Sequence, residues 1–423
     1  MSGPAREGGA LRPLHVLHVI GGDDTGGAMI HLLPLLAALA SGGCDVQLLC
    51  LGGGGLAREA QRRGLRVGVL PMKGARDPRV LGPLRRALCS GPAGLESLRR
   101  TSVTEAATGS VEAAEAAAPR WDVVHTHGMR ANLPVRLAAL TMRERPCLFT
   151  TVHSDLGLDY ASPLLAWIYQ AADRATLGLA DRIVCVSEAL RNLLEVRGYP
   201  AERLVTVRSG LETAAAVVSP GAAGERTDER AAQRPRIGTV ARLVAVKDID
   251  LLLEAARLLR PTHPELEVVI VGDGPERERL EAVATRLGLA GAVNFAGRLD
   301  KATATLRGLD VYLVTSVFEG GVSMAALEAM ENGVPVVTTD AGGVAEAVLD
   351  GVTGYVVTRD LERGALAAAL AERTAALLDD PALRARMGAA GALRVREHFT
   401  VEETAAQTLR VYQQCCPPTR GGR

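Results

Sequence analysis

The chain has 423 residues, 48 of them basic and 48 acidic, so its formal net charge is zero. This balance leaves no net positive charge of the kind typical of nucleic-acid-binding proteins. The 46 glycines follow no fixed period, which excludes a collagen-like or low-complexity protein. Hydrophobic residues make up 48% of the chain but aromatic residues only 3%, so we expect a large core of aliphatic side chains in two or three domains.

The seven cysteines contain no CxxC pair, and several lie in or beside apolar segments, which favours free thiols in a reducing compartment. Residues 1–13 lack the apolar segment of a signal peptide. The longest helical apolar run, residues 28–40, contains His31 and Pro34 and is shorter than the roughly 20 residues of a membrane span. We therefore expect a cytoplasmic protein without a transmembrane segment. Peripheral membrane contact through residues 85–100 remains open, although prolines and glycines interrupt that segment.

Short apolar segments alternate with helical segments along most of the chain. Strands are predicted at residues 15–20, 45–50, 66–70, 122–127, 147–153, 182–187, 204–208, 236–241, 267–271, 293–296, 311–315, 335–339 and 354–357. Their apolar runs are mostly continuous, which is typical of parallel strands covered by helices on both faces. The pattern predicts an α/β protein made of two doubly wound, Rossmann-like halves.

The alternation is interrupted at residues 213–235, which we interpret as a linker. The predicted domains are an N-terminal Rossmann-like domain, residues 1–212, and a C-terminal one, residues 236–400. A helix and tail follow at 401–423, and the small-residue segment 90–119 is predicted to be a mobile insertion. Ligands of such sheets bind beyond the carboxyl ends of the strands, so residues that follow strands are the candidates for chemistry.

The strongest signal follows the predicted strand 311–315. The next loop contains Glu319, Gly320, Gly321, Val322 and Ser323. Ser323 is predicted to cap a helix that ends near Asn332. Glycines let backbone approach a ligand closely, and a helix start offers free N–H groups, which together are typical of a diphosphate site. Glu328, on the second turn, could accept hydrogen bonds from ribose hydroxyls. Solvated carboxylates remain the alternative interpretation for both glutamates.

Two cations follow the predicted strand 236–241, ahead of a helix that Asp248 or Asp250 could cap. Arg242 and Lys247 could neutralise a pyrophosphate leaving group there. Solvent-exposed loop cations are the alternative. The chain has only three lysines, which slightly favours a functional role for Lys247.

Three histidines end predicted strands: His125, His127 and His153. Imidazoles suit zinc, but no HExxH motif or cysteine pair supplies a further ligand, so we expect no metal site. His127 and His153, which share an alternation parity, could instead hydrogen-bond a sugar. For His125 an ordinary loop histidine is the alternative.

In this order, the motifs resemble those of the retaining glycosyltransferases of family four, over nearly the whole chain. The matching segments are TGGAMIHLLPLL, DVVHTHG, TTVHS, ADRIVCVSEAL, ARLVAVKD, VGDGPERERL, FEGGVSMAALEAMENGVPVVTTDAGGVAEAV and EHFTVEETAAQTLRVY. The resemblance implies a GT-B fold, in which two Rossmann-like domains face each other across a cleft. It also implies that the last helix, near 401–414, crosses back to the first domain.

The resemblance also implies residue roles. Arg242 and Lys247 would hold the donor phosphates, Glu328 the ribose, and Glu319 and His153 would lie near the transferred sugar and take part in catalysis. The implied donor-binding residues are Gly26, Gly27, Arg242, Lys247, Gly320, Gly321, Val322, Ser323 and Glu328. His127 is a further candidate for sugar or acceptor contact.

The expected reaction moves a hexose-type sugar from a UDP- or GDP-linked donor to an unidentified glycan, lipid-linked or small-molecule acceptor, with retention of configuration. The nucleotide sugar is a substrate, and no cofactor or metal is expected. Two alternatives stay open. A GT-B epimerase would isomerise the donor without an acceptor. The second alternative is a non-catalytic nucleotide-sugar-binding protein. Glu319 and Glu328 are nine residues apart, whereas the family commonly spaces its two glutamates eight apart, and this difference keeps that alternative open.

Overall fold

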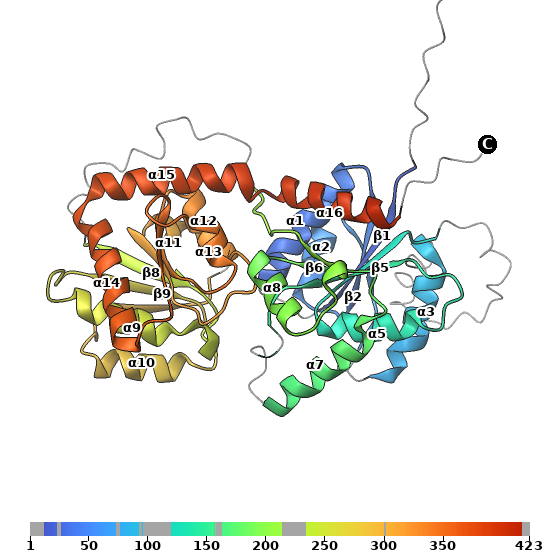
Figure 1. The fold of residues 1–423 in the computed structure, drawn as a ribbon, viewed down its shortest axis with the longest axis horizontal. Coiled ribbons are helices and arrows are strands. Elements are labelled where there is room, and N and C mark those ends of the chain that lie inside the picture. The colour runs from blue at the N-terminus through green and yellow to red at the C-terminus, as the bar shows by residue number, and fades with distance from the viewer. Residues whose placement is uncertain are drawn as a thin grey trace, which may run out of the picture. The chain divides into compact units, whose positions relative to one another are not determined.

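The computed structural model describes residues 12–22, 27–72, 77–92, 95, 120–155, 157, 163–213, 234–299 and 302–416. Gly26 and nearly all of the predicted insertion (90–119) and linker (213–235) lie outside this part of the chain. The chain divides into two compact units. The first comprises Met1–Cys185, Leu194–Val207 and Thr404–Arg423, and the second comprises Val186–Leu193 and Arg208–Glu403. Each unit contains one sheet (Figure 1).

The sheet of the first unit has seven strands in the order β3-β2-β1-β4-β5-β6-β7, and all pairings are parallel. Its strands are β1 (His15–Gly21), β2 (Asp45–Leu51), β3 (Arg66–Val69), β4 (Val123–His127), β5 (Cys147–Val152), β6 (Arg182–Cys185) and β7 (Leu204–Thr206). The helices between these strands are α1 (Gly27–Ser41), α2 (Gly55–Arg62), η1 (Pro78–Val80), α3 (Leu81–Cys89), α5 (Met129–Ala139), α7 (Pro163–Leu177), α8 (Glu188–Val196) and η2 (Ala201–Arg203). Most of α8, up to Leu193, belongs to the second unit.

The sheet of the second unit has six strands in the order β10-β9-β8-β11-β12-β13, again all parallel. Its strands are β8 (Arg236–Val240), β9 (Glu267–Val271), β10 (Val293–Gly297), β11 (Val311–Val314), β12 (Val336–Thr339) and β13 (Gly354–Val357). The helices are η4 (Ala245–Lys247), α9 (Ile249–Leu259), α10 (Arg277–Arg286), α11 (Thr303–Arg307), α12 (Met324–Glu331), α13 (Val344–Ala347), α14 (Arg363–Asp379) and α15 (Pro381–His398).

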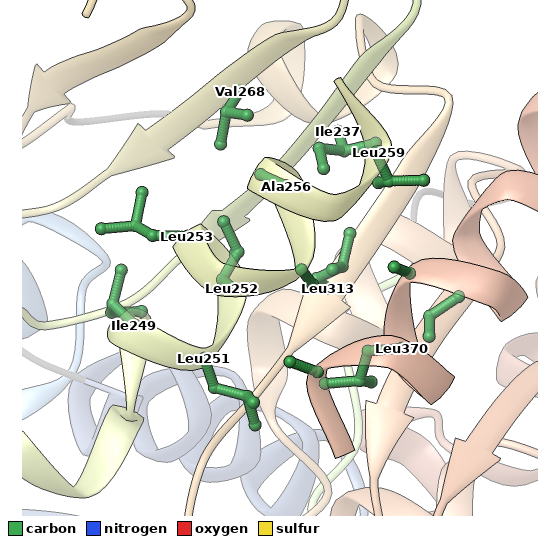
Figure 2. Close-up of a cluster of buried hydrophobic side chains, with 14 of the residues drawn as sticks. Ile237, Ile249, Leu251, Leu252, Leu253, Ala256, Leu259, Val268, Leu313 and Leu370 are labelled. Carbon is green, nitrogen blue, oxygen red and sulfur yellow. The ribbon is translucent and has the colours of Figure 1, made fainter. Parts of the chain in front are cut away.

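Helix α9 is buried in the core of the second unit. On α9 the consecutive residues Leu251, Leu252 and Leu253 are all fully buried. A helix that is apolar on most of its circumference must be covered on more than one side. Figure 2 shows α9 between sheet residues such as Val268 and the side chain of Leu370 on α14.

In both sheets the strand order reverses beside the first strand of the unit, between β1 and β4 and between β8 and β11. This is the doubly wound arrangement, and the predicted pair of Rossmann-like halves is confirmed. The crevice beyond the carboxyl ends of the two strands at such a reversal is where these sheets bind ligands. The loops after β8 and β11 therefore form the candidate ligand site of the second unit.

Helix α16 (Val401–Cys415) lies against the first unit from Thr404 onward. Tyr412 is fully buried there, and its ring packs edge-on against Phe149 of β5 with 4.9 Å between the centroids. Among the described helices, none has both the length and the hydropathy needed to cross a bilayer.

Candidate active site

The loops after β8 and β11 are bonded to each other in the second unit. The backbone N–H of Val317 donates to the carbonyl of Val246 at 2.8 Å, and Thr315 Oγ1 donates to the carbonyl of Lys247 at 3.1 Å. The predicted candidates on these two loops are therefore held in one place, at the strand reversal.

Lys247 is paired with the glutamate of the glycine loop. Its Nζ lies 2.6 Å from Oε1 of Glu319, and Ser316 Oγ donates to the same oxygen at 2.5 Å. The side chain of Lys247 is 23% exposed and that of Glu319 is 11% exposed. The sequence placed both residues at the site but did not foresee that each neutralises the other.

Arg242 differs from Lys247 in its surroundings. Its side chain is exposed in the loop after β8, and its guanidinium has no hydrogen bond or ion pair to any other described residue. Its positive charge is thus available to an anion without any partner having to be displaced.

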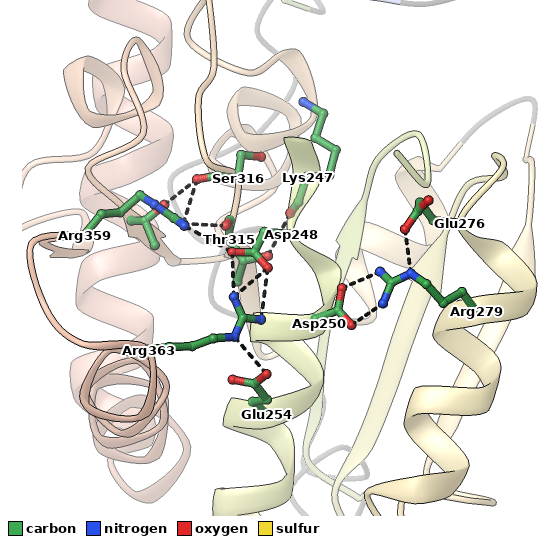
Figure 3. A network of polar contacts seen from close by, with 11 residues as sticks. Lys247, Asp248, Asp250, Glu254, Glu276, Arg279, Thr315, Ser316, Arg359 and Arg363 are labelled. Atoms are coloured by element: carbon green, nitrogen blue, oxygen red, sulfur yellow. Dashed lines mark hydrogen bonds and ion pairs between the residues drawn. The ribbon is translucent and has the colours of Figure 1, made fainter. Parts of the chain in front are cut away.

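A second arginine and an aspartate support the backbone beneath Lys247 (Figure 3). Arg359 donates to the carbonyls of Thr315 and Ser316 at 3.0 and 3.1 Å and to Asp248 Oδ2 at 3.1 Å. Arg363 also binds the Asp248 carboxylate, at 3.1 Å. Asp248 precedes α9 with a positive φ of 44°.

The prediction that Asp248 or Asp250 caps α9 is wrong. The Asp248 carboxylate makes no capping bond and binds the two arginines instead. Asp250 lies in the first turn, where its carboxylate pairs with Arg279 at 2.5 and 2.8 Å. The Asp248 ion pairs therefore fix the loop, whereas the Asp250 pair joins α9 to α10. Arginine offers a carboxylate a two-point contact that a backbone N–H does not.

The glycine loop is fixed by close backbone contacts. The carbonyl of Gly320 accepts a 2.6 Å hydrogen bond from Ser187 Oγ. A Cβ added to Gly343 would lie 2.5 Å from the carbonyl carbon of Gly321, and Gly342 has a φ of +68°. The two glycines of the 342–343 turn, which the sequence analysis passed over, are needed so that the loop can lie this close.

The start of α12 differs from its prediction in one respect. Ser323 is at the N-cap position, but its φ is +57° and its side chain makes no capping hydrogen bond, so the predicted serine cap is wrong. This backbone conformation directs the side chain away from the first turn, where a cap hydroxyl must accept. The side chain of Val322 is fully buried in the core, so only its backbone could meet a ligand. The helix ends at Glu331, with Asn332 and then Gly333 (φ +74°) after it.

Glu328 lies on the second turn of α12 and is half-buried. Its carboxylate has no hydrogen bond to any other described residue. Burial, together with the charge of Glu331, raises the pKa of Glu328 above its usual range. Glu319 and Glu328 also both raise the pKa of the buried Tyr312 phenol, so the two carboxylates share the electrostatic environment of one residue on β11.

The three predicted histidines belong to the first unit and form one buried cluster with a fourth, His18. His125 and His127 are on β4, His18 is on the neighbouring strand β1 opposite His125, and His153 directly follows β5. His127 is 2% exposed, with Nε2 2.9 Å from His18 Nδ1 and Nδ1 3.3 Å from His153 Nε2. This argues against the predicted sugar contact of His127, because neither ring nitrogen is free. His153 is half-buried at the end of the row.

Comparisons with known proteins match this arrangement. The family model described as "Glycosyl transferase 4-like domain" matches residues 26–210, and "Glycosyl transferases group 1" matches residues 225–394. The chain is 30% identical to a D-inositol 3-phosphate glycosyltransferase of Acidothermus cellulolyticus, over 96% of this chain and 89% of that one. It is 28% identical to a glycogen synthase of Mycobacterium tuberculosis, over 69% of each chain.

The fold is similar to that of Anabaena HepE in complex with UDP, with a TM-score of 0.70 and 19% identity over 95% of this chain and 100% of the other. The chain belongs to the family-four glycosyltransferases. It is an enzyme of the GT-B fold that uses a nucleotide-sugar donor, as the resemblance implied.

The second unit therefore places three of the predicted kinds of donor contact at one strand reversal, and their binding of a donor remains a prediction. Arg242 has an exposed guanidinium group, and the ammonium group of Lys247 is paired with Glu319. The backbone of the 320–323 loop precedes α12. Gly27 begins α1 in the first unit, whereas its neighbour Gly26 lies outside the described residues.

Residues that the sequence analysis missed fall into two groups. Ser316 and Arg359 support the Lys247–Glu319 pair, and His18 and Tyr412 belong to the histidine cluster. A usable signal existed for His18, since an imidazole inside the apolar strand HVLHVI must find a buried partner. No local signal marks Tyr412, which is 287 residues from its partner His125.

Proposed function

We propose that this glycosyltransferase transfers a hexose-type sugar from a UDP-linked donor to a carbohydrate acceptor with retention of configuration. The observation that carries the proposal is the half-buried carboxylate of Glu328, on the second turn of α12, which bonds to no other residue that the structure describes. Such a carboxylate is suited to accept hydrogen bonds from the two ribose hydroxyls of a nucleotide. UDP is preferred to GDP here because the solved structure of HepE, with a similar fold, is a UDP complex.

In the proposed reaction the bond between the anomeric carbon and the β-phosphate oxygen breaks, and the electron pair leaves with the diphosphate. The growing negative charge is stabilised by Arg242, Lys247 and the backbone N–H groups at the start of α12. Preorganised charges of this kind usually make the largest contribution to lowering such a barrier. The acceptor hydroxyl attacks from the same face, and its proton passes to the departing phosphate oxygen.

Glu319 has two tasks in this proposal. In the free enzyme it holds Lys247 in position through the 2.6 Å ion pair. When the diphosphate binds, the ammonium group of Lys247 exchanges its contact with Glu319 for a contact with the phosphate. Glu319 then becomes available to hydrogen-bond the transferred sugar. His153 is assigned to a sugar hydroxyl, since it is the half-buried member of the histidine row.

The test is a donor screen followed by product analysis. UDP and GDP are titrated calorimetrically, and UDP-sugars and GDP-sugars are then incubated with a panel of mono- and oligosaccharide acceptors. We expect UDP to bind more tightly than GDP, and the new glycosidic bond to keep the donor's anomeric configuration in the proton NMR spectrum. An inverted product contradicts the retaining mechanism, and isomerisation of the donor without acceptor identifies the epimerase alternative.

A further inference from the structure

Six groups of the first unit form a continuous chain of hydrogen bonds. In order they are Thr151, His125, Tyr412, His18, His127 and His153. Tyr412 joins the two parts of this chain, because its phenol oxygen lies 2.5 Å from His125 Nδ1 and 3.4 Å from His18 Nε2. The phenol comes from α16, whereas the other groups come from β1, β4 and the end of β5.

The remaining contacts engage all the other ring nitrogens of the three inner histidines, His18, His125 and His127. His125 Nε2 lies 2.6 Å from Thr151 Oγ1, and His18 Nδ1 lies 2.9 Å from His127 Nε2. His127 Nδ1 lies 3.3 Å from His153 Nε2. Within the described part of the chain, His153 Nδ1 is the one nitrogen of the row with no partner.

All four imidazoles are neutral near pH 7. Burial lowers the pKa of His18 to about 3 and that of His153 to about 4. The pKa values of His125 and His127 are also lowered well below the usual range, mainly by burial. A neutral imidazole has one N–H donor and one bare acceptor nitrogen, so each hydrogen bond in the row determines the direction of the next.

The position of the single phenol proton of Tyr412 therefore selects between two opposite directions of hydrogen bonding along the chain. If Tyr412 donates to His125 Nδ1, it accepts from His18 Nε2–H, and then His127 and His153 must also carry their protons on Nε2. If Tyr412 instead donates to His18, the order reverses and all four histidines carry the proton on Nδ1. In the first pattern His153 Nδ1 is an acceptor, and in the second it is a donor.

The distances favour the first pattern. A phenol O–H is a stronger donor than a neutral imidazole N–H, so its proton belongs on the shorter contact. That contact is the one to His125, at 2.5 Å against 3.4 Å to His18. Burial raises the pKa of Tyr412 well above its usual value, so the phenol keeps its proton.

We propose that Tyr412 is a positioning residue that orients this histidine chain, so that His153 presents Nδ1 as a hydrogen-bond acceptor to a carbohydrate hydroxyl. The last clause rests on the proposed function, whereas the orientation itself does not. The C-terminal helix thereby determines the tautomer of a candidate catalytic residue on the far side of the row. Neither the family match nor the position of His153 at a strand end assigns this role to Tyr412.

A metal site is the competing interpretation of the same cluster. Ligand atoms of His18, His125 and His127 lie within 4.8 Å of one another. However, all six of their ring nitrogens are engaged in the hydrogen bonds described above. A metal ion would have to break the short contacts to Tyr412 and Thr151 or the 2.9 Å contact between His18 and His127, so the hydrogen-bonded chain accounts for the geometry better.

The direct test is nitrogen NMR of the full-length protein labelled with ¹⁵N-histidine, recorded without substrate at pH 7. The shifts and proton couplings of the ring nitrogens distinguish the two tautomers, and single His→Asn variants assign the signals. We expect His18, His125, His127 and His153 all to carry the proton on Nε2. A proton on Nδ1 of His153 in the wild type overturns the proposal, and this measurement needs no variant of Tyr412 and no enzymatic turnover.

The Tyr412→Phe variant tests whether the phenol sets the direction. We expect at least one of the four histidines to change to the Nδ1–H tautomer, and kcat/KM to fall roughly 2- to 10-fold, the scale of one neutral hydrogen bond. If all four tautomers are unchanged, Tyr412 does not orient the chain. The matched control is Tyr199→Phe, since Tyr199 is also buried in the first unit but bonds to Asp173 at 2.8 Å, away from the histidines.

A double variant separates positioning from a general structural role. In His153→Asn the link to His127 is lost, while an acceptor oxygen remains near the position of Nδ1. Adding Tyr412→Phe to this background should leave kcat/KM unchanged, because the route through His153 no longer exists. A loss as large as in the wild-type background shows that Tyr412 acts otherwise and contradicts the proposal. Absence of turnover with every donor would contradict the proposed function alone, since the tautomers are read without substrate.

Discussion

Lys247 and Glu319 are 72 residues apart in the sequence, and their charged groups lie 2.6 Å apart in the structure. The pair is mostly buried, and Ser316 donates a further hydrogen bond to the same Glu319 oxygen. A phosphate that approaches Lys247 must therefore compete with Glu319 for the ammonium group. The two residues should behave as one unit in catalysis.

The first prediction follows from this coupling. Lys247→Ala should lower kcat by roughly 10²-fold, the scale of losing one contact to the developing charge. Glu319→Gln should also lower kcat, and the double variant should lose less than the product of the two single losses. Steady-state rates with a fixed acceptor measure all three.

Arg242→Ala is the matched control for the coupling. It should reduce kcat on the same scale, because Arg242 is the other proposed phosphate contact. Its effect should multiply with that of Glu319→Gln, because Arg242 has no bond to Glu319. Multiplicative losses for Lys247 and Glu319 as well would mean that the ion pair is not maintained in the working enzyme.

Much of this site could be predicted from the sequence because its residues follow strands. Short, mainly apolar segments, RIGTV and VYLV, marked β8 and β11, and the loops after them contain Arg242, Lys247 and Glu319. The parallel order of the sheet then brings these loops together, which a strand-by-strand reading anticipates. Glu328 was also predictable, because Gly333 and Pro335 delimit its helix.

The remaining features depend on contacts between distant segments, which periodicity does not encode. Asp248 was expected to cap its own helix, but Arg359 and Arg363, more than 100 residues later, bind its carboxylate. Ser323 was expected to cap α12, but its φ is +57° and its side chain makes no capping hydrogen bond. Local sequence rules assume local partners, and Asp248 has tertiary ones.

The second prediction concerns metals. Thorough treatment with EDTA should leave glycosyl transfer unchanged, because the proposed leaving-group site already has two cations and a helix start. Rates before and after dialysis, together with the metal content of the protein, provide the measurement. Complete loss of activity that one divalent ion restores would contradict the metal-free mechanism and return attention to His18, His125 and His127.

The third prediction concerns the stability of the first unit. Arg136 and Asp173 form a buried ion pair at 2.7 Å, with side chains only 1% and 4% exposed. Arg136→Met should lower the free energy of unfolding by about 3–5 kcal/mol, because it leaves the Asp173 carboxylate buried without its cation. Both tryptophans, Trp121 and Trp167, are in the first unit, so their fluorescence in a urea titration reports on this unit.

The control for this prediction is a more exposed pair in the same unit. Arg145 and Asp181 are also bonded at 2.6 Å, but their side chains are 37% and 31% exposed. Arg145→Met should therefore change the free energy of unfolding by no more than about 1 kcal/mol. Equal losses in the two variants would show that burial does not determine the strength of the Arg136 pair.

The last prediction separates binding from stability at Glu328. Replacing its carboxylate in Glu328→Gln should weaken UDP binding by about 1–2 kcal/mol, because a neutral amide accepts hydrogen bonds from the ribose more weakly than a carboxylate does. The same change should raise the Tm of the free protein at neutral pH. Burial raises the pKa of Glu328, so the charged form destabilises the folded state.

The pH dependence has a definite sign. Between the usual glutamate pKa and the raised pKa of Glu328, the folded protein binds more protons than the unfolded chain, so the contribution of Glu328 to stability falls as the pH rises. The affinity for UDP should change in the opposite direction and rise with pH as the carboxylate forms. Both trends should disappear in Glu328→Gln when calorimetric titrations and thermal melts are repeated across this range.

Glu331→Gln is the matched control for Glu328. Glu331 ends the same helix, and burial raises its pKa too. Its replacement should therefore also raise Tm, but UDP affinity should stay at the wild-type value, because Glu331 is not assigned to the ribose. If Glu331→Gln weakens UDP binding as much as Glu328→Gln does, the loss reflects the charge of the helix and not a ribose contact. The assignment of Glu328 would then have to be withdrawn.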